Sequence, residues 1–258
     1  MKEKIIKLTK SFLRKIGIII ILPKDTKLIS DLKIKFFHNE RSFVYGLTKR
    51  LVDTLYCHAS PGVLESIINY FYNTHTKENI KHSKLLNLGG GSGQVSDIFR
   101  AIGFDVYNLD IEIKEESQKN IKFDLNSTSD LPFSFDYFDV VICSEIIEHI
   151  ENPWKLFRGV KNVLKSGGVM VLTTPNVQSF FSRINFLFTG YLHWFSPKCF
   201  GYHINPVFKW EIDLISKKNN FVLISLFGNG EYFLGKKNKN HKKIIKKNDT
   251  LIFIFKKI

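Results

Sequence analysis

Short apolar runs alternate with amphipathic stretches from residue 60 onward, and this pattern is typical of an α/β domain. Residues 85–88 suit a buried parallel strand, and residues 94–102 carry apolar side chains at helical spacing until Gly103 ends the helix. The remaining apolar runs predict six further strands, at residues 105–109, 121–123, 138–144, 169–173, 221–227 and 250–255.

Capping signals place several helix ends. Ser60 and Pro61 predict a helix start with Ser60 as the N-cap, and residues 77–84 then form a polar connection. A second helix begins after Asn152, and we expect a glycine C-cap within residues 165–168 to end it.

A glycine-rich turn joins the first strand to its helix. Gly89-Gly90-Gly91-Ser92-Gly93 leaves backbone N–H groups exposed at the helix start. The next strand ends at Asp110, and a carboxylate there can accept hydrogen bonds from both hydroxyls of a ribose. A dinucleotide fingerprint would need glycine at Gln94, so a nicotinamide dehydrogenase is disfavoured.

Residues 85–93 resemble the first motif of class I S-adenosylmethionine-dependent methyltransferases. The resemblance extends over residues 60–258 and implies a Rossmann-like, seven-stranded, mostly parallel sheet with helices on both faces and an antiparallel last strand. It rests on Asp124, residues 131–133 and 138–141, Glu145, Glu148 and His149, and residues 164–168 and 174–176. At Asn87 the chain departs from the acid that is common in the family.

The resemblance implies that S-adenosylmethionine is the cofactor and that the chain is an enzyme. Asp110 would hold the ribose, and Asp124 would bind the adenine amino group while Leu125 packs on the ring. The alternative role for Asp124 is a helix cap or turn. The full expected set is Asn87, Gly89, Gly91, Gly93, Asp110, Ile111, Asp124, Leu125, Ser144 and Glu145.

A hydroxyl acceptor must also lose a proton, so a base is expected near the methyl group. Histidine suits this role, and we rank His203 first, His149 second and His193 third. Residues 201–206 resemble a segment of bacterial methyltransferases of surface-polysaccharide and lipid-type pathways, which implies that His203 faces the methyl group. Nitrogen or carbon acceptors would need less help.

Glu145, Glu148 and His149 are spaced to share one face of a helix turn. In ubiquinone-pathway O-methyltransferases, which this segment resembles, the same triplet has been linked to a divalent metal. Alternatively, Glu145 shapes the cofactor pocket while the other two side chains pair locally. We expect the second arrangement, with no metal.

Residues 177–207 are too long for an ordinary connection and are dense in aromatic side chains. This predicts a lid insertion that could stack on a sugar, a quinol ring or a lipid. A packed helical insert is the alternative.

Residues 1–58 are expected to form an N-terminal helical extension or cap, and residues 59–258 the methyltransferase domain. The apolar run at residues 16–22 is too short to span a bilayer, so we expect it to pack on the protein, with peripheral membrane contact as the alternative. Three scattered cysteines fit a cytoplasmic location, and the alternative places the chain at the inner membrane face as a peripheral protein.

We expect methyl transfer to a small-molecule hydroxyl, on a sugar, a glycolipid precursor or a quinol-like compound. The net charge of +14 leaves a nucleic-acid methyltransferase as the runner-up, although the Asn/Asp-Pro-Pro-Tyr/Phe motif of such enzymes is absent after the fourth strand. We therefore expect no nucleic-acid partner. A non-catalytic cofactor-binding module stays open because of Asn87, and the sequence leaves the oligomeric state open.

Overall fold

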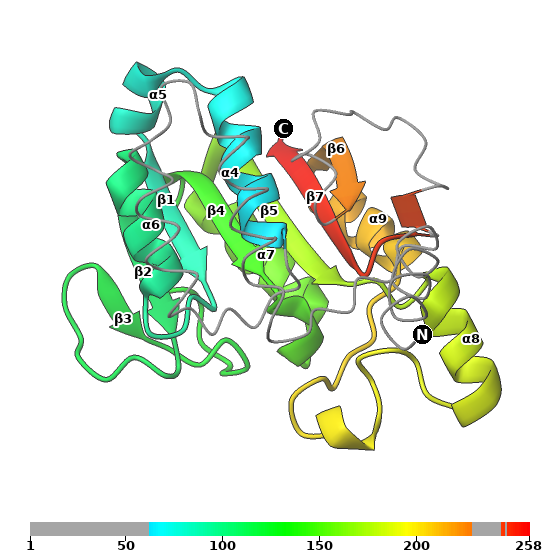
Figure 1. The fold of residues 1–258 in the computed structure, drawn as a ribbon. Helices are drawn as coiled ribbons and strands as arrows, with labels where there is room; N and C mark the ends of the chain where they lie inside the picture. Colours follow the sequence, from blue (N-terminus) through cyan, green and yellow to red (C-terminus); the bar gives the residue numbers. More distant parts are fainter. Residues whose placement is uncertain (1–61, 229–243, 246) are drawn as a thin grey trace, which may run out of the picture. The chain divides into compact units, whose positions relative to one another are not determined.

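A computed structural model describes residues 62–228, 244–245 and 247–258, which contain a seven-stranded sheet in the order β3-β2-β1-β4-β5-β7-β6 (Figure 1). The strands are β1 Lys84–Leu88, β2 Asp105–Asp110, β3 Asn120–Lys122, β4 Phe138–Ser144, β5 Leu164–Pro175, β6 Phe221–Gly228 and β7 Thr250–Lys257. The first five strands pair in parallel, and β7 lies antiparallel between β5 and β6. The predicted fold class is confirmed.

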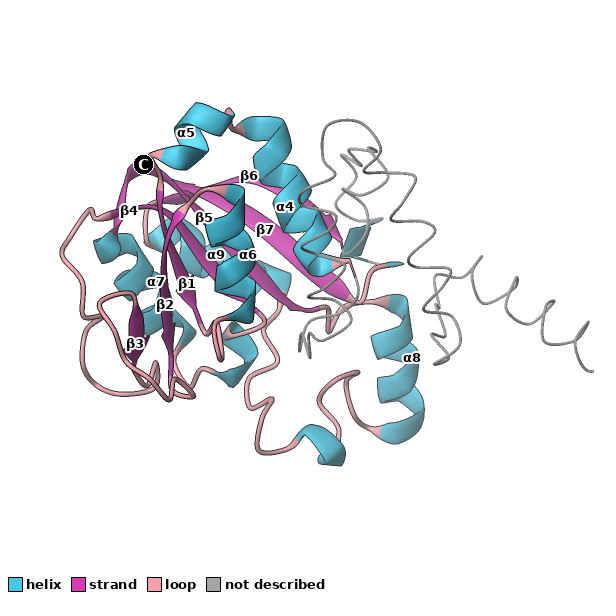
Figure 2. Ribbon diagram, turned by 60° about the vertical axis from the view of Figure 1, so that its left-hand side comes forward, coloured by secondary structure: helices cyan, strands magenta, loops and turns pink. Residues whose placement is uncertain are grey.

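Helices cover both faces of this sheet (Figure 2). Phe71 of α4 packs edge-on against Phe99 of α6 on one face, while α7 and α9 cover the other. The described helices are α4 Val63–Thr74, α5 Lys77–Lys81, α6 Gln94–Ile102, α7 Pro153–Val163, α8 Phe180–Thr189 and α9 Lys209–Lys218, with short 3₁₀ helices η2 Ile147–His149 and η3 Pro197–Cys199.

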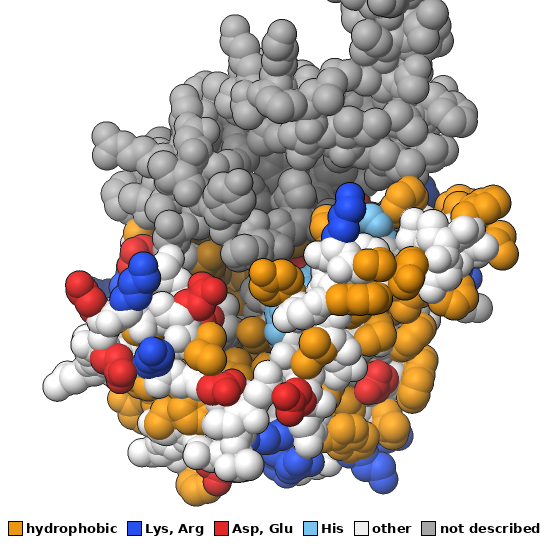
Figure 3. All heavy atoms as spheres, turned by 90° about the horizontal axis from the view of Figure 1, so that it is seen from below, with side chains coloured by type: hydrophobic (Ala, Val, Ile, Leu, Met, Phe, Trp, Pro, Cys, Tyr) orange, Lys and Arg blue, Asp and Glu red, His pale blue; other side chains and the backbone are white. Residues whose placement is uncertain are grey.

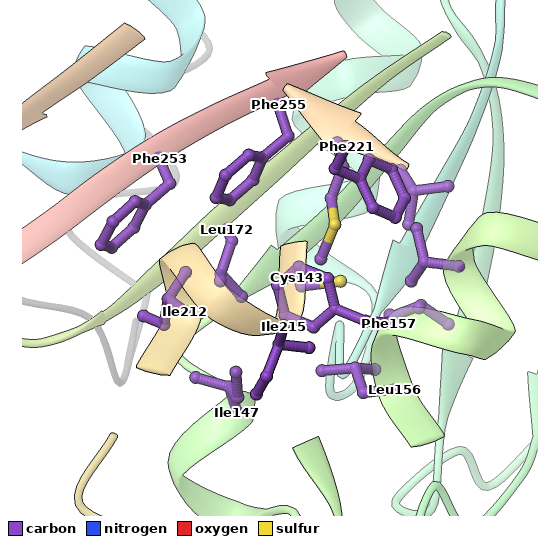
Figure 4. Packing of buried hydrophobic residues seen from close by; sticks show 14 of the residues in the cluster. Cys143, Ile147, Leu156, Phe157, Leu172, Ile212, Ile215, Phe221, Phe253 and Phe255 are labelled. Carbon is purple, nitrogen blue, oxygen red and sulfur yellow. The ribbon is translucent and has the colours of Figure 1, made fainter. Parts of the chain in front are cut away.

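The main core forms where alternate residues of the central strands meet α7 and α9 (Figure 4). Cys143 of β4 and Leu172 of β5 point to this side and pack with Phe157 and Ile215, all fully buried. Their sequence neighbours, such as Ile142, are buried on the opposite face. Because both faces are covered, the strands read as continuous apolar runs rather than as alternating patterns.

Two predicted helix ends are wrong. Gly62, with φ +88°, is the N-cap of α4 and gives no side-chain cap, whereas the prediction placed the N-cap at Ser60, which lies outside the described residues. At the end of α7, Leu164 is already extended and begins β5, so no glycine caps the helix. The glycines instead lie inside β5, where the register to β4 shifts and Gly167 adopts φ +78°.

The polar connection expected at residues 77–84 contains the short helix α5, which Thr76 caps by accepting a hydrogen bond from the N–H of Asn79. Among the described residues, no helix is long and apolar enough to cross a membrane. Cys143 and Cys199 are free thiols, buried and partly buried, as expected. The N-terminal extension at residues 1–58, including Cys57, and most of the lysine-rich stretch 236–247 lie outside the described residues.

Candidate active site

The candidate site lies where β1, β2, β4 and β5 end, at the carboxyl edge that Figure 3 views directly. Two turns meet there. A Cβ added to Gly89, after β1, would lie 2.6 Å from Cδ1 of Ile146, which follows β4. Ligands of open α/β sheets bind at the carboxyl edge, so the two turns lie where the sequence predicted the cofactor site.

The glycine turn is closed on one side and open on the other. Gly89, Gly91 and Gly93 have φ values of +71°, +54° and +94°, which disfavour residues with side chains. A Cβ on Gly90 would lie 2.0 Å from Oδ1 of Asn108, whereas one on Gly91 would meet no atom of the described residues within 4 Å. A ligand can therefore approach the backbone closely at Gly91.

Asp110 joins the end of β2 to this turn through a hydrogen bond. Its Oδ2 accepts a hydrogen bond from the N–H of Gly91 at 2.8 Å, and its Oδ1 accepts one from Glu112 at 2.8 Å. A carboxylate has about four acceptor positions, so two remain for ribose hydroxyls. Ile111, the next predicted contact, is largely exposed. These residues fit an adenosyl ligand as the resemblance implies.

A buried polar chain supports the turn from beneath. The Nδ2 of Asn87 donates to Oγ of Ser96 at 3.0 Å, and this hydroxyl donates to Oδ1 of Asn108 at 2.8 Å. Nδ2 of Asn108 then donates to the carbonyl of Gly91 at 3.2 Å. Asn87 is only 2% exposed, so its amide positions the turn, while its contact with the cofactor stays a prediction.

Sequence reasoning missed Ser96 and Asn108. The available signal was a polar residue at a buried position of each element: Asn108 interrupts the apolar run of β2, and Ser96 lies on the inner side of α6. Buried polar groups need hydrogen-bond partners, so two such residues near a glycine turn indicate a shared network.

Asp124 forms a local turn, because its Oδ1 accepts a hydrogen bond from the N–H of Asn126 at 2.8 Å. Asn126 in turn donates to the carbonyl of His149 at 3.1 Å and accepts from the N–H of Glu151 at 2.9 Å. These bonds fasten the Asp124–Leu125 loop to the segment after β4. The adenine contacts of Asp124 and Leu125 stay predictions.

Glu145 has an unusual backbone conformation for a residue with a side chain, with φ +50°. The hydroxyl of Thr173 accepts a hydrogen bond from the N–H of Glu145 at 2.9 Å and donates one to Oε1 of Glu145 at 2.6 Å. Oγ of Ser144 lies 3.1 Å from the same hydroxyl. Burial raises the pKa of Glu145 to about 7, against the opposing effect of the Thr173 hydrogen bond. Strain and a shifted pKa of this kind are common at functional sites.

Glu148 is fully buried beside Glu145. Its Oε2 accepts a hydrogen bond from Thr174 at 3.3 Å, and its Oε1 has no hydrogen-bond partner among the described residues. Burial, and then the negative charge of Glu145, raise the pKa of Glu148 well above its ordinary value. The neutral carboxyl form is therefore favoured.

His149 and His203, far apart in sequence, lie together with ring centroids 4.9 Å apart. Nδ1 of His149 lies 2.6 Å from the carbonyl oxygen of Tyr202, and Nδ1 of His203 lies 2.7 Å from that of Trp194. A carbonyl only accepts hydrogen bonds, so both Nδ1 atoms carry the proton. In the neutral rings, Nε2 of each then carries the basic lone pair.

The expected triplet of Glu145, Glu148 and His149 on one helical face is wrong, since η2 spans only Ile147–His149. Instead, Glu148, His149 and His203 each offer a ligand atom, and these atoms lie within 4.8 Å of one another. One carboxylate and two imidazoles could hold a divalent cation. The absence of a metal stays a prediction.

His193, the third candidate base, has different ring neighbours from this pair. Its ring packs on Phe181 and Trp194 with centroids 4.7 Å from each. Burial lowers the pKa of His193, and the negative charge of Asp249 opposes that shift. Its surroundings are those of a packed side chain of the insertion.

A model of a family described as a methyltransferase domain matches residues 57–226. A ubiquinone biosynthesis O-methyltransferase of Cereibacter sphaeroides is 30% identical over 102 residues, covering 36% of this chain and 41% of the relative. An uncharacterized protein of Methanocaldococcus jannaschii is 30% identical over 109 residues, covering 42% and 52%. The chain thus spans only about half or less of these relatives' length.

A solved structure titled a SAM-dependent methyltransferase, from Archaeoglobus fulgidus, superposes with a TM-score of 0.50 at 19% identity, covering 76% of this chain and 95% of that one. At this identity the match shows a common fold.

The glycine turn yields a paired prediction. Gly90→Ala should lower the free energy of unfolding by about 1–3 kcal/mol, because the new methyl group collides with the Asn87–Asn108 network. Gly91→Ala should cost only about 1 kcal/mol of left-handed strain, but it places a methyl group on the open side and should weaken S-adenosylmethionine binding. Urea unfolding and calorimetry measure the two effects. Full stability of Gly90→Ala would contradict the described turn.

The buried carboxyls predict a pH dependence of stability. The pKa values of Glu145 and Glu148 lie above the unfolded value of 4.5, so the folded state binds more protons and loses stability as pH rises above about 5. Glu148→Gln should reduce the loss of stability between about pH 5 and pH 8, because the side chain can no longer release a proton. Urea unfolding across this range tests it, with exposed Glu116→Gln as the control. If the free energy of unfolding falls with pH equally in Glu148→Gln and Glu116→Gln, the pKa of Glu148 is not raised by folding and the prediction fails.

Proposed function

The chain belongs to the methyltransferase-domain family, and on that premise we propose that it transfers a methyl group from S-adenosylmethionine to a hydroxyl of a small molecule. The acceptor class we propose is a sugar, a glycolipid precursor or a quinol-like compound. One observation carries the proposal: the Gly91–Asp110 hydrogen bond and the His149–His203 pair lie at the same edge of the sheet.

The residues of the turn would hold the cofactor. The backbone of residues 89–93 would lie against its amino-acid part, and Asp110 would accept hydrogen bonds from its ribose. Asp124 and Leu125 would bind the adenine ring. When bound, S-adenosylmethionine supplies a methyl group that its sulfonium has already activated.

The imidazole pair would take the proton that a hydroxyl acceptor must lose. Nε2 of His203 or His149 accepts this proton, while each Nδ1–H stays bonded to a backbone carbonyl and keeps the ring oriented. The neighbouring carboxyl of Glu148 would stabilise the resulting imidazolium when it is ionised. The rest of the rate gain would come from holding the acceptor hydroxyl in line, which is worth several kcal/mol.

Two features support a small molecule over a nucleic acid. Asp110 and Asp124 place two carboxylates at the carboxyl edge, where a phosphate backbone would be repelled. The curated relative from Cereibacter sphaeroides is named an O-methyltransferase of ubiquinone biosynthesis, which supports a hydroxyl acceptor.

A labelled-methyl assay on fractionated cell extract tests the proposal. We expect label from S-adenosylmethionine in a small-molecule or lipid-soluble fraction, and at least roughly tenfold weaker cofactor binding in Asp110→Asn. Asp105→Asn, at the opposite end of β2, is the matched control and should bind normally. Label in RNA, or cofactor binding without transfer to any fraction, would contradict the proposal.

The imidazole pair gives a separate prediction. His203→Ala and His149→Ala should each lower kcat about a hundredfold or more while the Kd for S-adenosylmethionine changes little. His82→Ala, at the exposed end of α5, should leave both values unchanged. Activity should also survive EDTA. A loss of activity that added divalent metal restores would assign Glu148, His149 and His203 to a metal site.

A further inference from the structure

Helix α8 is amphipathic, but its apolar side chains are exposed while a polar one is buried. Its only buried residue is Ser182, whose Oγ accepts a hydrogen bond from the N–H of His193 at 3.1 Å. Asn185, on the same side, donates to the carbonyl of Tyr191 at 2.8 Å. The side of α8 that carries Ser182 and Asn185 thus faces the protein, although Phe186, one turn after Ser182, is 53% exposed.

The opposite side of α8 is an exposed apolar stripe. Leu187 and Phe188 are 73% and 80% exposed. Helical spacing places the members of the stripe on one side of the helix. They are Phe180, Phe181, Ile184, Leu187 and Phe188. An amphipathic helix normally turns such a stripe toward the core, so this one fits an apolar phase outside the domain.

The stripe continues into the segment that follows α8. Together with it, the exposed side chains of Tyr191, Trp194, Phe200, Tyr202 and Ile204 form what we term the α8 surface. Figure 3 shows hydrophobic side chains gathered on the side of the carboxyl-edge face where α8 lies in Figure 1. Contiguous apolar surface of this kind marks an interaction site.

The segment that forms the α8 surface carries cations and no acidic residue of its own. Residues 176–210 contain no aspartate or glutamate but carry Arg183, Lys198 and Lys209, of which Lys209 is already paired with Asp213. Arg183 lies on α8 and Lys198 on η3, and both are exposed. This combination of aromatic side chains and cations complements a surface that is apolar within and anionic at its boundary.

We propose that the α8 surface binds a lipid bilayer that contains anionic headgroups. Phe180, Leu187 and Phe188 would enter the boundary between headgroups and acyl chains, Trp194 and Tyr202 would lie at headgroup level, and Arg183 and Lys198 would contact phosphates. A second copy of the chain fits less well, because a two-fold contact would place this acid-free, cationic surface against itself. Lipid binding of this kind does not depend on methyl transfer.

Vesicle co-sedimentation of the full chain tests this surface. The wild type should sediment with vesicles of phosphatidylcholine and phosphatidylglycerol, less with phosphatidylcholine alone, and less at high salt. The double variant Leu187→Ser, Phe188→Ser should bind at least roughly tenfold more weakly. The matched control Phe135→Ser, Val222→Ser removes exposed apolar side chains outside the α8 surface and should bind like the wild type.

Three outcomes would overturn the proposal. The first is a wild type that ignores anionic vesicles, and the second is a double variant that binds them as tightly as the control does. The third is a wild-type dimer in light scattering that the double variant converts to monomer without any change in vesicle binding. Cofactor binding by the double variant confirms that it is folded, and it keeps this test separate from the test of methyl transfer.

Discussion

The hydrogen bond between the N–H of Gly91 and the carboxylate of Asp110 is the contact on which the site depends. It joins the ends of two neighbouring strands and holds a turn whose three left-handed glycines would otherwise be free to rearrange. The buried chain from Asn87 to Asn108 fixes the same turn from below. Because both supports act on Gly91, the open side of the turn is preorganised for a ligand.

The opposite half of the site contains the unfavourable elements of the structure. Glu145 adopts a left-handed conformation, and Glu148 is a buried carboxyl with an unpartnered oxygen among the described residues. Features like these each cost of order 1–3 kcal/mol and persist only where the surrounding structure is stable. The packed cluster of Phe157 on α7 with Phe253 and Phe255 on β7 contributes to that stability, because burying each ring contributes about 1.5–3 kcal/mol.

Local signals predicted the parallel half of the fold well. The bounds of β4 and the α6 stop at Gly103 were predicted because each depends on a few adjacent residues. The meeting of the glycine turn with Asp110 followed from the motif that joins two neighbouring strands. The glycines after α7 were misread as a C-cap, since a bulge inside β5 demands the same conformation as a helix end. Sequence analysis treated His149 and His203 as separate candidate bases. It could not predict that they pair, because the pairing depends on contacts between segments about fifty residues apart. The outward direction of the α8 stripe could not be predicted either, since sequence periodicity identifies an apolar side of a helix but not whether that side faces the core or the solvent.

The position of β7 has a consequence for biosynthesis. This strand is last along the described chain, yet it pairs with β5 on one side and β6 on the other. The strands β1 to β5 can pair as they leave the ribosome, whereas β5 and β6 keep unsatisfied edges until translation passes Lys257. The nascent chain therefore passes through a stage in which five of the seven strands have paired and the edges of β5 and β6 await the same partner strand. At that stage chaperone binding would protect the chain most.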